Sequence, residues 1–239
     1  SLVLSLVTVV LAFAAWYIAT NAGWVKPLFL PSPQAVWAQL LEVARDGFAD
    51  ATLLNHIAWS ALRVFGAFVL AVLTAIPVGI MMGVNRVARG IFDPLVEFYR
   101  PLPPLAYLPL VVIWMGIGEG SKVLLIYLAM FAPLALSARA GVKSVAIEQI
   151  HAAYSMGASR AQVLRHVIMP AALPEVLTGM RIAIGFGWTT LVAAEMVAAT
   201  AGLGFMVSNA SKFMDTDVVI MGILVIVVMS LIFDLCMGV

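Results

Sequence analysis

Long apolar runs separated by short polar segments dominate the chain. An apolar run of about 20 residues crosses roughly 30 Å of hydrocarbon as a helix. Six runs are interpreted as membrane spans: 2–19, 56–83, a run through Trp114, 122–145, 175–199 and 218–239. The pattern predicts an all-α, polytopic membrane protein with six transmembrane helices in a single domain, residues 1–239.

The third run is short because prolines interrupt it, at positions 101, 103, 104 and 109. Broken helices at membrane depth require surrounding protein or a water-lined cavity. We therefore expect this run to face the interior of the bundle. Residues 85–100, which precede it, are expected to form a short charged connection. Residues 26–56 and 201–217 are expected to be polar loops, the first with a surface helix over 35–45.

Small residues recur every four positions in the second run, at Ala75, Gly79 and Gly83. This spacing favours close helix packing in lipid.

Another long interruption of the apolar runs is residues 148–174. A short helix from 147 to 156 is expected to end at Gly157, because glycine readily adopts the left-handed conformation that stops a helix. Ser159 and Gln162 have the spacing of a capping box and predict the start of a second helix. That helix is expected to end before Pro170.

This second helix is amphipathic. Its apolar side contains Val163, Leu164, Val167 and Ile168, and the side expected to be exposed to water contains Arg160, Gln162 and Arg165. A DNA-binding helix-turn-helix and a plain surface loop are the competing interpretations. The flanking spans place the segment beside a bilayer and count against nucleic acid as a partner.

Composition agrees with a membrane protein. The 239 residues are 64% hydrophobic and only 10% charged, with a mean hydropathy of +1.09, against about 25% charged residues in soluble domains. The sequence neither begins with Met nor ends outside an apolar run, so we expect it to be a core without its tails. The single cysteine, Cys236, excludes a disulfide framework within the chain and is expected to pack.

Known catalytic and nucleotide-binding patterns are missing from the sequence. It has no Walker A pattern and no pair of histidines at ligand spacing. His56, His151 and His166 are scattered and are expected to make hydrogen bonds. We therefore expect no catalytic residue, no metal site and no cofactor in this chain, and neither ATP binding nor a membrane-enzyme activity.

Basic residues predict the orientation. With 148–174 in the cytoplasm, the inner segments contain Arg86, Arg89, Arg100, Arg139, Lys143, Arg160, Arg165 and Arg181. The outer segments contain Lys26, Arg45, Arg63, Lys122 and Lys212. The inner excess follows the positive-inside rule and places both termini in the cytoplasm.

The corner at 148–174 resembles the EAA loop of ABC importer permeases. The matching residues are His151, Ala152, Ala153, Gly157, Ile168, Met169 and Pro170, with His151 in place of the usual Glu. Two longer stretches are similar to the nitrate, sulfonate and taurine permease family, and most to its taurine-transporter branch. They are 93–129, DPLVEFYRPLPPLAYLPLVVIWMGIGEGSKVLLIYLA, and 187–213, GWTTLVAAEMVAATAGLGFMVSNASKF.

The resemblance implies a type I ABC importer permease of the bacterial inner membrane that carries taurine or a related aliphatic sulfonate. It also implies a second copy of the chain, two ATPase subunits that bind ATP and Mg, and a periplasmic binding protein. Contact with the ATPase is then expected from His151, Ala152, Ala153, Gly157, Ala158, Ser159, Val163 and Leu164. Nitrate, bicarbonate or another alkanesulfonate is the alternative solute.

An ion-coupled secondary transporter is the rival class, with intramembrane carboxylates as its signature. Glu195 and Asp234 are the candidates, and Glu195 is expected to reach water near the outer end of its span. The fifth run is otherwise rich in small and polar residues. We expect the solute pathway beside it, at Trp188, Thr189 and Thr190, although threonine hydroxyls also bond back to their own helix. Arg63 is expected either to snorkel to the headgroups or to meet an anionic solute.

Overall fold

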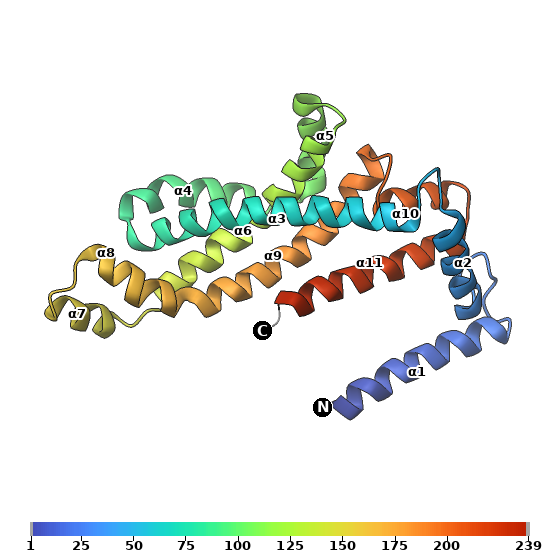
Figure 1. The fold of residues 1–239 in the computed structure, drawn as a ribbon, viewed down its shortest axis with the longest axis horizontal. Coiled ribbons are helices and arrows are strands. Elements are labelled where there is room, and N and C mark those ends of the chain that lie inside the picture. The colour runs from blue at the N-terminus through green and yellow to red at the C-terminus, as the bar shows by residue number, and fades with distance from the viewer. Residues whose placement is uncertain (1, 238–239) are drawn as a thin grey trace. The chain divides into compact units, whose positions relative to one another are not determined.

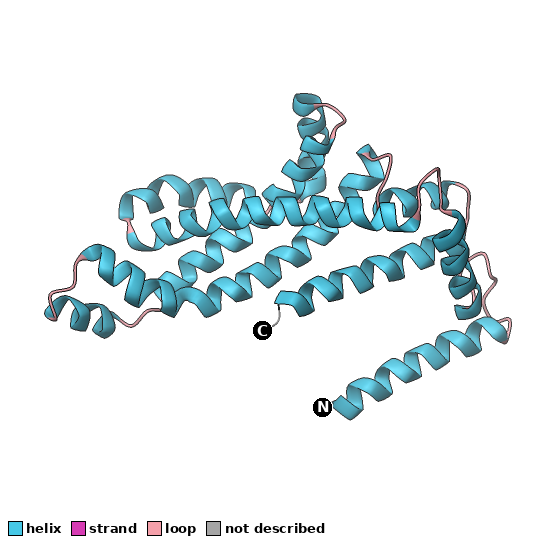
Figure 2. Ribbon diagram, viewed as in Figure 1, coloured by secondary structure: helices cyan, strands magenta, loops and turns pink. Residues whose placement is uncertain are grey.

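The computed structural model describes residues 2–237, which form helices joined by short loops with no strand among them (Figures 1 and 2). The helices are α1 (Leu2–Asn21), α2 (Pro33–Asp46), α3 (Leu53–Val84), α4 (Arg86–Tyr99), α5 (Pro104–Met115), α6 (Glu119–Lys143), α7 (Ile147–Ser155), α8 (Arg160–Val163), the π-helix η1 (Leu164–Ile168), α9 (Met169–Ala198), α10 (Leu203–Lys212) and α11 (Thr216–Met237). The expected all-α class is confirmed.

Five stretches of helix are long and apolar enough to cross a membrane: Leu4–Asn21, Leu53–Val84, Glu119–Lys143, Arg160–Val197 and Thr216–Cys236. The expected third span is α5, which has 12 residues. At a rise of 1.5 Å per residue it extends about 18 Å, short of a full crossing. The prediction of a short span is therefore confirmed. Cys236, expected to pack, is exposed on α11.

The chain divides into two compact units, which we describe separately. The first contains residues 2–60 and 195–229. Its core brings Val36 and Val43 of α2 together with residues of α10 and α11, including Leu203, Met206 and Met221. The expected surface helix is confirmed, although it begins earlier, because the Ser32 side chain caps it and Pro33 occupies its first turn.

Residues 201–217, expected to be a polar loop, contain the helix α10. Leu203, Met206 and Ala210 recur at helical spacing and are fully buried. This apolar stripe stabilises a ten-residue helix. The polar residues of the segment had indicated a loop instead.

Glu195 lies in the same unit and is fully buried, so the expectation that it reaches water is wrong. Its carboxylate accepts hydrogen bonds from the Ser60 hydroxyl and from the backbone N–H of Gly204, the latter at 2.8 Å. His56 is also buried, and its ring nitrogens lie 3.1 Å from the backbone of Gly202 and 3.0 Å from the Phe48 carbonyl. The hydrogen-bonding role expected for His56 is confirmed.

The second unit contains residues 61–194 and the end of α11. The small residues of α3 pack against α6, as their spacing predicted. Ala75 is fully buried, a Cβ on Gly79 would collide with the backbone of Ala135, and one on Gly83 would collide with Val142. Only glycine permits this approach between α3 and α6.

Helices α6 and α9 run antiparallel in the same unit, with glycines along their contact (Figure 1). Gly141 of α6 lies against Ala172 and Glu175, and Gly179 of α9 lies against Ser137. This contact determines which side chains of α6 and α9 share a cavity.

Two connecting segments are more helical than the sequence indicated. The segment before the prolines is the helix α4, which begins because the Asn85 side chain accepts the Val87 N–H at 2.8 Å. The helix after Ser159 does not stop before Pro170, because η1 continues it into α9. In this π turn the Met169 N–H bonds to the Leu164 carbonyl, five residues back, and the next residue is Pro170, which has no N–H to satisfy.

Candidate functional site

The corner between α7 and α8 has the backbone geometry that its sequence predicted. Helix α7 ends at Ser155, and Gly157 follows with φ +83°, in the left-handed region. The Gly157 N–H donates to Tyr154 at 2.9 Å, and the Ala158 N–H donates to Ala153 at 3.1 Å. These two bonds form a Schellman motif, which satisfies the last carbonyls of α7.

The next helix begins with the predicted capping box. The Ser159 N–H donates to the Gln162 side chain at 2.7 Å, and the Gln162 N–H donates back to the Ser159 hydroxyl at 3.4 Å. The two bonds stabilise the first turn of α8 and fix the direction in which it leaves the corner.

The predicted coupling residues divide into a buried and an exposed set. Ala153 and Val163 are buried with Val142, Ile168 and Ala172, and Ala158 and Leu164 are partly buried against that cluster. His151, Ala152, Gly157 and Ser159 are exposed. The predicted faces of the amphipathic helix are confirmed, and Ala153 belongs to the chain's own core.

The surface at Gly157 is open. A Cβ added to Gly157 would meet no atom within 4 Å. Beside the corner lies a cavity of about 710 Å³ where α3, α4, α6, α7 and α8 meet. Tyr154, Arg86 and Arg160 line it, so two basic side chains flank the depression.

The residues expected along the solute pathway face different directions. Trp188 is buried, and its ring packs edge-on against Phe233, with centroids 5.5 Å apart. Among the residues that the structure describes, no acceptor is within hydrogen-bond distance of its ring N–H. Thr190 is buried. Thr189 is exposed, and its hydroxyl donates to the Phe186 carbonyl at 2.9 Å, within its own helix.

Arg63 neither snorkels nor lies open to a solute. It is 3% exposed, and its guanidinium donates to both carboxylate oxygens of Glu119, at 2.6 and 2.8 Å. Lys122 donates to the same carboxylate at 2.7 Å. The sequence did not indicate this pair, because Glu119 lies 56 residues away from Arg63.

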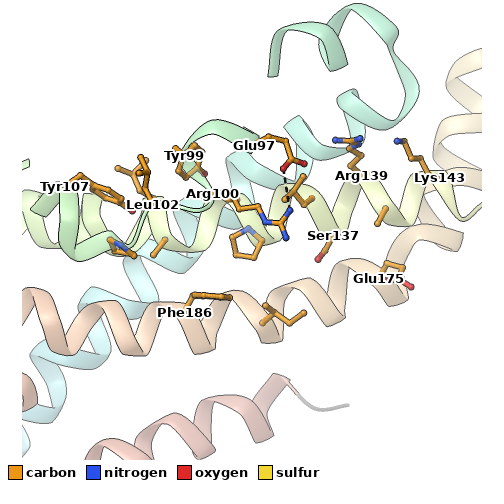
Figure 3. Close-up of a pocket in the computed structure, with 18 residues that line it drawn as sticks. Glu97, Tyr99, Arg100, Leu102, Tyr107, Ser137, Arg139, Lys143, Glu175 and Phe186 are labelled. Carbon is orange, nitrogen blue, oxygen red and sulfur yellow. Dashed lines mark hydrogen bonds and ion pairs between the residues drawn. The ribbon is translucent and has the colours of Figure 1, made fainter. Parts of the chain in front are cut away.

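A second cavity, of about 630 Å³, lies in the second unit between α4, α6 and α9 (Figure 3). Its lining residues are Glu97, Tyr99, Arg100, Leu102, Pro104, Tyr107, Leu128, Ala129, Ala132, Pro133, Leu136, Ser137, Arg139, Ala140, Lys143, Glu175, Ile182 and Phe186. Sequence reasoning considered none of these residues as a contact for a solute. The only available signal was the presence of charges at the ends of the apolar runs.

The charges of this cavity fall into two groups. Arg100 lies 3.5 Å from Glu97, and Arg139 is paired with Asp93. Lys143 and Glu175 have no ion-pair partner within residues 2–237.

The cavity is also lined by a buried phenol. The Tyr99 hydroxyl is buried and has no hydrogen-bond partner among the residues described. Burial raises the pKa of Tyr99, so the phenol stays protonated and remains a donor.

Comparison with known sequences assigns the chain to a family. The profile described as the binding-protein-dependent transport system inner membrane component matches residues 75–239. The chain belongs to this family. The taurine transport system permease protein TauC of Escherichia coli (strain K12) is 57% identical to this permease over 233 residues, 97% of this chain and 85% of that protein. The putative aliphatic sulfonates transport permease protein SsuC of the same organism is 31% identical over 211 residues, 88% of this chain and 79% of that protein.

A solved structure shares the fold of this binding-protein-dependent permease. A chain of the MetNI methionine ABC transporter, in an inward-facing conformation, matches with a TM-score of 0.64. The match covers 78% of this chain and 94% of that chain, at 18% sequence identity. The predicted family and the ABC permease fold are therefore confirmed, and the permease is a multi-pass membrane protein.

Proposed function

We propose that this chain is the transmembrane permease subunit of an ATP-driven ABC importer that moves taurine, or a related aliphatic sulfonate, into the cytoplasm by alternating access. The observation that carries the proposal is the 57% identity to a taurine transport permease across 97% of this chain. The aliphatic sulfonate permease is 31% identical over a smaller share. The difference favours an amino-sulfonate over other sulfonates and over nitrate or bicarbonate.

The coupling corner supports the requirement for an ATPase partner. His151, Ala152 and Gly157 form an exposed patch in which Ala152 and Gly157 add little side-chain bulk, and the Schellman motif and the capping box fix its backbone. Such a patch permits close backbone approach by another protein. The buried Val163 and Ala153 pack the patch against α6 and α9. A displacement of the corner by a partner is therefore transmitted to these two transmembrane helices through direct side-chain contacts.

The complete transporter in this proposal contains two copies of the permease, two ATPase subunits that bind ATP and Mg, and a periplasmic binding protein. The permease lies in the inner membrane with the coupling corner and both termini in the cytoplasm. The excess of basic residues on that side supports this orientation.

Transport by the purified complex tests the function. The permease, its ATPase and its binding protein are reconstituted in proteoliposomes, and accumulation of radiolabelled taurine is measured with and without ATP. We expect accumulation of the radiolabelled taurine to require ATP. Excess unlabelled taurine should reduce that accumulation, whereas excess nitrate or bicarbonate should leave it unchanged. If nitrate or bicarbonate competes and unlabelled taurine does not, the assignment of taurine as the solute is wrong. If uptake occurs without the ATPase, the assignment to ATP-driven importers is wrong.

A further inference from the structure

Figure 3 shows Lys143 of α6 and Glu175 of α9 at one end of the cavity, which we call its mouth. Lys143 is the last residue of α6, and Glu175 lies in the second turn of α9. A Cβ on Gly141 would lie 3.0 Å from the Glu175 Cβ and 2.8 Å from the Ala172 carbonyl. Because α6 and α9 touch at this glycine, Glu175 and Lys143 line the same end of the cavity.

These two charges differ from the others around the cavity. Arg139 and Arg100 are each engaged by a carboxylate of α4, which neutralises them locally. Lys143 and Glu175 are exposed, and neither has an ion-pair partner within the described residues. The mouth therefore presents one available cation and one available anion on facing helices.

A small solute that carries both an anionic and a cationic group complements this arrangement. A sulfonate accepts hydrogen bonds from an ammonium group, and a primary ammonium donates to a carboxylate. A solute with the anionic group alone would form an ion pair with Lys143, and the Glu175 carboxylate would repel it.

We infer that the mouth of this cavity is a solute site of the permease, at which Lys143 binds the sulfonate and Glu175 binds the ammonium group of a zwitterionic amino-sulfonate. The inference rests on the proposed function and adds to it the residues that recognise the solute. It predicts that the permease binds an amino-sulfonate more tightly than a plain alkanesulfonate.

The other walls of the cavity are suited to the passage of such a solute. Ile182 and Phe186 supply apolar surface along α9, and the unpartnered Tyr99 hydroxyl supplies a donor in the cavity. Thr189 follows Phe186 by three residues, beyond the lining residues of the cavity and on the same side of α9. One of the three residues expected from the sequence to line the pathway therefore shares the side of α9 that borders the cavity.

Direct binding to the permease–ATPase complex tests the site, because the binding protein would otherwise dominate the apparent affinity. The complex is placed in nanodiscs without binding protein, and binding of radiolabelled taurine and of radiolabelled ethanesulfonate is measured. Ethanesulfonate has the sulfonate but no ammonium group. The variants are Lys143→Met and Glu175→Gln, with Lys212→Met and Glu42→Gln as controls that are exposed and do not line this cavity.

We expect Glu175→Gln to weaken taurine binding about tenfold and to leave ethanesulfonate binding unchanged or stronger, since only taurine carries the cation. Lys143→Met should weaken both by about tenfold. The two control variants should bind as the wild type does. Equal losses for both solutes in Glu175→Gln would indicate a structural charge pair and overturn the inference.

The uptake assay separates this inference from the proposed function. If the wild-type complex accumulates taurine and both cavity variants bind and transport it normally, the site is wrong and the function stands. If the wild-type complex neither binds nor accumulates taurine, the proposed function itself fails.

Discussion

The Ser60 hydroxyl lies 2.8 and 3.0 Å from the two carboxylate oxygens of Glu195, and both side chains are fully buried. Ser60 accepts the Leu203 N–H at 2.8 Å, and Glu195 accepts the Gly204 N–H at 2.8 Å. The first N–H groups of a helix have no partner within the helix. Residues of α3 and α9 thus cap α10, which has no cap from its own N-cap residue.

Removal of this cap should destabilise the protein. Glu195→Ala leaves buried donors without an acceptor, and each such donor costs about 1–3 kcal/mol. We expect a lower midpoint of thermal unfolding for the detergent-solubilised permease. Glu195→Gln keeps one acceptor oxygen and should lose less. An unchanged midpoint for Glu195→Ala would contradict the capping role.

Gly202 should tolerate no side chain. Its φ of +136° is rarely adopted by other residues, and an added Cβ would collide with the Glu195 carboxyl group. We expect Gly202→Ala to lower the free energy of unfolding by about 1 kcal/mol or more. Gly66→Ala is the matched control, because a Cβ there meets nothing within 4 Å, and it should leave the unfolding midpoint equal or higher. Equal losses in both variants would mean that the special geometry at Gly202 is not the cause.

The coupling corner should fail when bulk and charge are added at Gly157. In Gly157→Glu the positive φ costs about 1 kcal/mol or more, and the side chain occupies the surface expected to meet the ATPase. Uptake and solute-stimulated ATP hydrolysis by the reconstituted complex should both be lost, while the permease still inserts and dimerises.

Two variants control for strain and for charge at this corner. Gly157→Asn keeps a residue that accepts a left-handed conformation and should retain more uptake than Gly157→Glu. His151→Glu restores the residue usual in the EAA loop at an exposed position and should transport normally. If Gly157→Glu keeps normal ATP hydrolysis and uptake, this corner is not the coupling element.

Thr189 and Thr190 should respond differently to removal of the hydroxyl. Thr189 is exposed on the side of α9 that borders the cavity, whereas Thr190 is buried. We expect Thr189→Val to raise the taurine concentration for half-maximal uptake several-fold, while Thr190→Val changes stability more than affinity. If the double variant transports at the normal rate and apparent affinity, the pathway does not pass these residues.

Cysteine accessibility in sealed cells should report the orientation. In a Cys236→Ser background, Glu42→Cys and Arg160→Cys each place one thiol at an exposed position. A membrane-impermeant maleimide added outside should label the first and spare the second until the cells are opened. If only Arg160→Cys is labelled in sealed cells, the orientation is the opposite of the one proposed.

Much of the fold follows from local sequence, whereas the errors at α10 and Glu195 come from distant contacts. Apolar runs, the glycine at 157 and the capping box at Ser159 act within a few residues, so they were predictable. Helix α10 and the burial of Glu195 depend on partners such as Ser60, which is 135 residues away from Glu195. The solute cavity was missed for the same reason, because Lys143 and Glu175 line one cavity through the packing of α6 against α9 at Gly141 and Gly179.

The π turn at Leu164–Ile168 makes residue changes between the corner and α9 unequal in their effect. A π turn holds one residue more than the α-helical ladder requires, and the bulge absorbs that residue so that the helix keeps its phase on either side. Deleting one residue there would restore regular hydrogen bonding and leave α8 in phase with α9. Inserting a further residue, with no second bulge to absorb it, would rotate α8 by about 100° relative to α9. Val163 would then leave its place against Val142, and the exposed patch at Gly157 would turn with it. A single-residue insertion, unlike a deletion, would therefore uncouple the corner from the transmembrane helices without breaking either helix.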